Sequence, residues 1–112
     1  AIFKASSYLE KGFSKRKIVF YLKNKGLSDE NIKFGISNLE KSFFNYELVS
    51  ALIFSRKKKI INFKKKKNDE IKKDLMRIAQ AGFSYEVAKK IVDIKNEEEY
   101  FNLEKYANTG KN

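Results

Sequence analysis

The sequence predicts an all-α fold, with tandem three-helix repeats that form a small elongated helical domain. Proline is absent and glycine occurs only five times in 112 residues, so long helices meet few interruptions. Apolar residues recur at the spacing of one helix face, and no segment alternates convincingly with a period of two. A glycine-centred sequence also occurs twice, which is typical of a repeat.

Residues 1–42 are expected to form the first repeat. Its helices are predicted over about 1–10, 14–25 and 28–40. Ser14 and Ser28 suit the N-cap positions of the second and third helices, because a serine oxygen accepts from the free amides of a first turn. The expected inward stripes are Ile2, Ala5 and Leu9, then Ile18, Val19 and Leu22, then Ile32, Ile36 and Leu39.

Residues 43–106 are expected to form the second repeat. Its helices are predicted over about 45–58, 69–81 and 84–95, with a further helix over about 96–106. The first of these has apolar residues around much of its circumference, which predicts a central, buried helix. Asn45 and Asn68 are the predicted N-caps. The next two inward stripes are Ile71, Leu75, Ile78 and Ala79, then Val87, Ala88, Ile91 and Ile94. Residues 107–112 are expected to form a mobile tail.

The two glycine-centred sequences, KNKGLSDENI and AQAGFSYEVA, align with an offset of 56 residues. In each, glycine suits the left-handed position that ends a helix, and the apolar residue after it turns back into the core. The serine then caps the next helix, with a glutamate in its first turn. A third corner begins at Lys11. The predicted structural corner residues are Gly12, Ser14, Gly26, Ser28, Gly82 and Ser84.

These corner sequences resemble the RecX regulatory family. The run from Gly12 to Ile18, continued by Leu22 and 25–28, is similar to its middle repeat, and 74–88 is similar to its closing repeat. The resemblance implies a curved molecule of three-helix repeats. It also implies a protein that lodges in the groove of the RecA recombinase filament and restrains its ATPase and strand exchange, without being an enzyme. The family usually has a further N-terminal repeat, which residues 1–112 lack.

Positive charge is concentrated in the first part of the chain. The net charge is +11; residues 1–67 carry 17 basic and 5 acidic side chains, and residues 68–112 carry 8 and 9. Such a field attracts a polyanion or an acidic protein surface. Lysine supplies 22 of the 25 basic residues, as in proteins of AT-rich genomes. Genome bias accounts for lysine over arginine, but not for the clustering.

Two groups of residues are candidates for binding a partner or polyanion. The helix over 14–25 carries its cations and one aromatic opposite its apolar stripe, where an acidic or phosphate-rich partner would meet them. The alternative, favoured because repeats must contact each other, is that the aromatic packs against the neighbouring repeat. The two groups are Arg16, Lys17, Phe20 and Lys23, then Arg56, Lys57, Lys58, Lys59, Lys64, Lys65, Lys66 and Lys67.

The sequence gives no support for catalysis or a cofactor. It has no histidine, no cysteine and no phosphate-binding glycine motif. Glu97, Glu98 and Glu99 are adjacent on a helix and cannot converge on a metal, so no metal site is expected. No apolar run is long enough to cross a membrane. We expect a cytoplasmic monomer.

The leading hypothesis is a non-enzymatic regulator that binds a RecA-type recombinase filament and inhibits or modulates it. The alternative is a small basic module that binds nucleic acid through 57–67 without sequence specificity, since lysines contact phosphates rather than read bases. A structural protein with no polyanion partner is a third hypothesis, supported only by genome bias.

Overall fold

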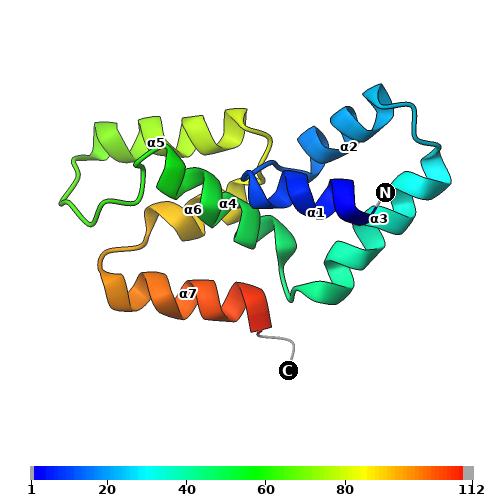
Figure 1. Ribbon diagram of the computed structural model, residues 1–112. Helices are drawn as coiled ribbons and strands as arrows, with labels where there is room; N and C mark the ends of the chain where they lie inside the picture. The colour runs from blue at the N-terminus through cyan, green and yellow to red at the C-terminus, as the bar shows by residue number, and fades with distance from the viewer. Residues whose placement is uncertain (1, 110–112) are drawn as a thin grey trace.

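Short corners divide the chain into helices, and the all-α prediction is confirmed. The computed structural model describes the backbone of residues 2–109 and the side chains of 4–109, and within this range it contains no strand. The helices are α1 (Ile2–Glu10), α2 (Lys15–Asn24), α3 (Asp29–Ser42), α4 (Tyr46–Lys57), α5 (Asn68–Gln80), α6 (Tyr85–Val92) and α7 (Glu97–Thr109) (Figure 1). The inward position predicted for Ile2 concerns a side chain outside this range.

The glycine corners share one hydrogen-bonding pattern. At the end of α2, Gly26 has a φ of +85°, its N–H donates to the Lys23 carbonyl at 2.9 Å, and the Leu27 N–H donates to the Leu22 carbonyl at 3.2 Å. The same pair of bonds ends α1 at residue 12 and α5 at residue 82. This is the Schellman arrangement, which satisfies the last carbonyls of a helix. The hydroxyl oxygen of the serine two residues after each glycine accepts a hydrogen bond from a backbone N–H in the first turn of the next helix, at 3.2 Å.

A fourth corner has the same bonds without a glycine. At the end of α4, Lys59 has a φ of +59°, its N–H donates to the Arg56 carbonyl at 3.0 Å, and the Ile60 N–H donates to the Ser55 carbonyl at 2.8 Å. Lys59 therefore occupies the place that Gly12 has after α1. The segment 60–66, between this corner and α5, has no counterpart in the first repeat, where Ser14 caps α2 directly.

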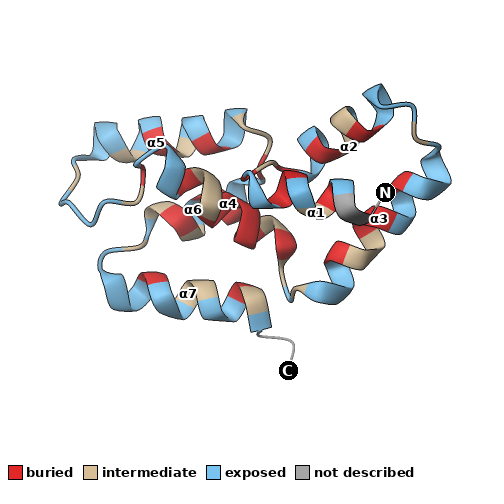
Figure 2. Cartoon of the chain, viewed as in Figure 1, coloured by how far each residue is buried: buried red, intermediate tan, exposed pale blue. Residues whose placement is uncertain are grey.

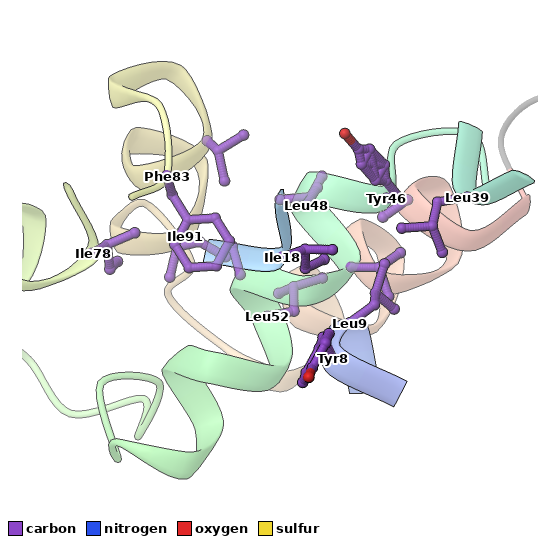
Figure 3. Close-up of a cluster of buried hydrophobic side chains, with 14 of the residues drawn as sticks. Tyr8, Leu9, Ile18, Leu39, Tyr46, Leu48, Leu52, Ile78, Phe83 and Ile91 are labelled. Carbon is purple, nitrogen blue, oxygen red and sulfur yellow. The ribbon is translucent and has the colours of Figure 1, made fainter. Parts of the chain in front are cut away.

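Helix α4 lies at the centre of the molecule, as its apolar circumference predicted. It packs against α1, α3, α6 and α7, while α1 also packs against α2 and α3, and α5 packs against α6. Its Leu48 and Leu52 belong to the same buried cluster as Ile18 of the first repeat and Phe83 and Ile91 of the second (Figure 3). The result is one continuous core in a body of 45 × 30 × 19 Å.

Helix α7 covers the side of α4 and is longer than the sequence indicated. The predicted mobile tail is wrong for 107–109, which form the end of α7. Ala107 is fully buried, and its carbonyl accepts from the Asn45 N–H at 3.0 Å. The small side chain lets α7 approach the start of α4, and this long-range contact leaves no local sequence signal. Residues 110–112 lie outside the described range.

Helix α5 departs from the predicted pattern in two ways. Lys67, not Asn68, precedes its first turn, and the Lys67 N–H donates to the Glu70 carboxylate at 3.5 Å. Ala79, predicted to face inward, is exposed, whereas Asp74 is buried. Much of the surface of α5 is exposed (Figure 2). The helix lies at an edge and contacts chiefly α6, so only part of its apolar stripe is covered. None of the described helices combines the length and apolar character needed to cross a membrane.

Candidate functional site

The four residues predicted on α2 line one groove. This corner groove lies between α2 and the corner that joins α5 to α6, and its floor and walls include no acidic residue. Phe20 is 59% exposed, with Arg16 one turn before it and Lys23 one turn after it on the same helix face. The lining residues are Ser14, Lys15, Arg16, Lys17, Val19, Phe20, Lys23 and 80–82.

A close contact between two corners positions α2 beside the second repeat. Gly82 has a φ of +102°, and a β-carbon there would overlap the hydroxyl of Ser14. That hydroxyl is buried and accepts from the Lys17 N–H, so it also fixes the first turn of α2. The corner groove therefore depends on a glycine in one repeat meeting a serine cap in the other.

The exposure of Phe20 contradicts the alternative that its ring packs against the neighbouring repeat. Its one ring contact in the described part of the chain is with Tyr21, edge to face at 5.5 Å. Tyr21 in turn stacks on Tyr8 and Phe13, at 5.5 and 5.3 Å. This cluster supports the base of α2 and leaves the Phe20 ring directed away from the core.

A second basic hollow adjoins the corner groove. This corner pocket lies where the α1–α2 corner meets the end of α4, and Lys17 and Ala81 line both hollows. Lys57 of α4 and Lys58, which caps the end of that helix, line it together with Lys11. The ammonium of Lys17 lies 4.2 Å from the centre of the Phe13 ring, and that of Lys57 donates to the Lys11 carbonyl at 3.3 Å. The fold thus joins cations that are about 40 residues apart in sequence.

Other predicted cations are engaged within the protein. Arg56 donates to the Tyr100 hydroxyl at 3.2 Å, and that hydroxyl donates to Glu104 at 3.0 Å, which ties α4 to α7. Burial raises the pKa of Tyr100; Glu104 adds to this effect and Arg56 opposes it. Lys66 is largely buried and binds Asp74 of α5 at 2.6 Å. Neither Arg56 nor Lys66 belongs to the basic surface formed by the corner groove and corner pocket.

The remaining predicted cations are exposed but lie elsewhere. Lys59 lies in the corner after α4, Lys67 precedes α5, and Lys64 and Lys65 border a different groove beside 60–66. Sequence reasoning missed Lys11 and Lys15, which contribute to the basic surface. Both adjoin the first glycine corner in sequence. They become part of a basic surface only because this corner packs against the end of α4 and near residue 82 in the fold.

The basic surface formed by the corner groove and corner pocket presents cations, an exposed aromatic ring and backbone polar groups, all of which can bind a partner. Among residues 4–109, no group of three or more acidic side chains is placed to hold a metal ion. No family model, curated protein or solved structure matches this chain. Its function is therefore inferred from the surface and from the corner sequences.

Proposed function

We propose that this protein is a non-enzymatic cytoplasmic regulator that binds the filament of a RecA-type recombinase and lowers its ATPase and strand-exchange rates. The observation that carries the proposal is the corner groove, where exposed Phe20 lies between Arg16 and Lys23 with no carboxylate in the lining. Aromatic and arginine side chains are the usual anchors of protein interfaces. The resemblance of the corner sequences to the RecX family agrees with this assignment.

The charge distribution favours a large acidic or phosphate-rich partner. With a net charge of +11, the protein attracts such a partner over long range, and a filament on DNA has many phosphates. Lys17 connects the corner groove to the corner pocket, so one partner surface could contact α2 and the end of α4 together. Repeat proteins commonly bind through extended surfaces of this kind.

The test is to titrate the protein against recombinase assembled on single-stranded DNA and follow ATP hydrolysis. We expect inhibition at stoichiometric amounts, and Arg16→Glu combined with Lys23→Glu should raise the amount required about tenfold or more. Lys72→Glu combined with Lys73→Glu is the matched control, since it changes the charge equally outside both hollows. An absence of inhibition by the wild-type protein would refute the proposal.

The corner groove also favours one alternative function, which is the binding of single-stranded nucleic acid without sequence preference. An exposed aromatic ring among cations suits a stacked base with adjacent phosphates. This alternative predicts binding to a labelled oligothymidylate without recombinase, with an affinity that falls steeply as salt rises. Loss of that binding in Phe20→Ala, but not in Lys64→Glu with Lys65→Glu, would assign it to the corner groove rather than to 57–67.

A further inference from the structure

The segment 60–66 is a built structure rather than a free run of lysines. Lys66 is fixed by two bonds of 2.6 Å, one to the Asp74 carboxylate and one to the Ile60 carbonyl. The Asn62 side chain donates to the Lys59 carbonyl at 3.0 Å and accepts from the Lys64 N–H at 3.1 Å. These bonds give the segment one defined path across the ends of α5 and α6.

That path leaves an apolar groove, which we call the loop groove. It has a volume of about 480 Å³ and lies between 60–66, the start of α5 and the end of α6. These segments meet at the end of the molecule away from α2 and α3 (Figure 1). The apolar lining that remains partly or well exposed consists of Ile61, Phe63, Ile71, Val92 and Ile94. The volume is sufficient for several side chains of a bound segment.

The rim of the loop groove is basic. Lys64, Lys65 and Lys95 are exposed, and none has a hydrogen-bond or ion-pair partner for its ammonium group among the described residues. The one carboxylate in the lining, Asp93, binds Lys89 at 3.0 Å. Three free cations therefore surround an apolar floor of four aliphatic side chains and Phe63.

We propose that the loop groove binds a short acidic amphipathic segment of a protein. Apolar side chains of that segment would fill the space above Ile71, Val92 and Ile94, while its carboxylates would meet the lysines of the rim. A nucleic acid fits less well, because the floor is mostly aliphatic and its one aromatic ring, Phe63, already contacts the Tyr100 ring edge to face at 6.2 Å. The loop groove shares no lining residue with the corner groove or the corner pocket, so this proposal goes beyond the proposed function.

The probe is a fluorescein-labelled helical peptide of about twelve residues, with leucines at i, i+3, i+4 and i+7 and glutamates elsewhere. Binding is followed by fluorescence anisotropy. We expect Lys64→Glu combined with Lys65→Glu to weaken binding about tenfold, whereas the matched pair Lys72→Glu and Lys73→Glu on α5 changes it less than about twofold. Ile94→Ser should also weaken binding, with circular dichroism confirming that the helices are retained.

Two control peptides separate the contributions of charge and apolar contact. Replacing glutamate by glutamine, or leucine by serine, should each reduce affinity strongly, because the loop groove supplies both a basic rim and an apolar floor. Equal loss in the 64/65 and 72/73 variants would overturn the proposal, as would unchanged binding of the glutamine peptide. Competitive displacement by oligothymidylate would assign the groove to nucleic acid instead, and no binding of the probe at millimolar concentration would also refute the proposal.

Discussion

Replacing Gly82 by alanine is expected to lower the free energy of unfolding by about 3–4 kcal/mol. The φ of +102° lies beyond the left-handed well that other residues tolerate, which costs about 2 kcal/mol. The new β-carbon would also overlap the Ser14 hydroxyl and lie 3.2 Å from the Ser14 β-carbon. Moving that buried hydroxyl removes the amide cap of α2, at a further cost of about 1–2 kcal/mol. This is a large share of the 5–15 kcal/mol typical of a domain.

Gly26→Ala is the matched control, because Gly26 has the equivalent place in the first repeat. Its φ is +85°, but a β-carbon there would meet no atom within 4 Å. Only the conformational cost of about 1 kcal/mol remains. Urea unfolding followed by circular dichroism measures both variants. Equal destabilisation by the two substitutions would refute the inference that the Gly82–Ser14 contact, rather than the left-handed backbone alone, joins the repeats.

Three further predictions concern other parts of the fold. Asp74→Ala should destabilise the protein by about 2 kcal/mol in urea unfolding, since it leaves Lys66 largely buried without its carboxylate; exposed Asp69→Ala should change stability little. Lys59→Gly should stabilise the protein by about 0.5 kcal/mol in the same assay, because a left-handed φ of +59° favours glycine. Burial, with nearby glutamates, raises the pKa of Tyr46, so stability should fall as pH rises above about 10, and Tyr46→Phe should reduce this fall.

Each of these predictions has a contradicting result. Equal stabilities of the Asp74 and Asp69 variants would show that the Lys66 ion pair contributes nothing. A destabilised Lys59→Gly variant would mean that the greater freedom of glycine in the unfolded chain outweighs the relief at this corner. A Tyr46→Phe protein with an unchanged alkaline stability profile would show that other groups cause the loss.

The corners were predictable because their determinants are local. A left-handed residue, an apolar residue and a serine cap act within about six positions, so Gly26, Leu27 and Ser28 together indicate the turn. The central position of α4 was predictable for a similar reason, since its own sequence places apolar residues around much of the helix circumference. The end of α4 was predicted, but the corner after it was not, because Lys59 adopts a left-handed conformation that its side chain does not favour.

The grouping of the cations could not be read from the sequence. Lys64, Lys65, Lys66 and Lys67 are adjacent, yet Lys66 is fixed to Asp74 while its neighbours are exposed. Lysines distant in sequence line one corner pocket only because two helix ends meet there. Such groupings depend on long-range packing, for which a charge run gives no signal. The loop groove is equally hidden, since its floor comes from the partly covered stripes of α5 and α6.

The central position of α4 has a consequence for how this molecule melts. In a linear array, each unit contacts only its neighbours, so a terminal unit can unfold while the rest persists. Here α4 contacts α1 and α3 of the first repeat as well as α6 and α7 of the second, so neither half retains a complete core without it. The chain should therefore melt in a single transition, with the amides in the middle of α4 among the last to exchange with solvent.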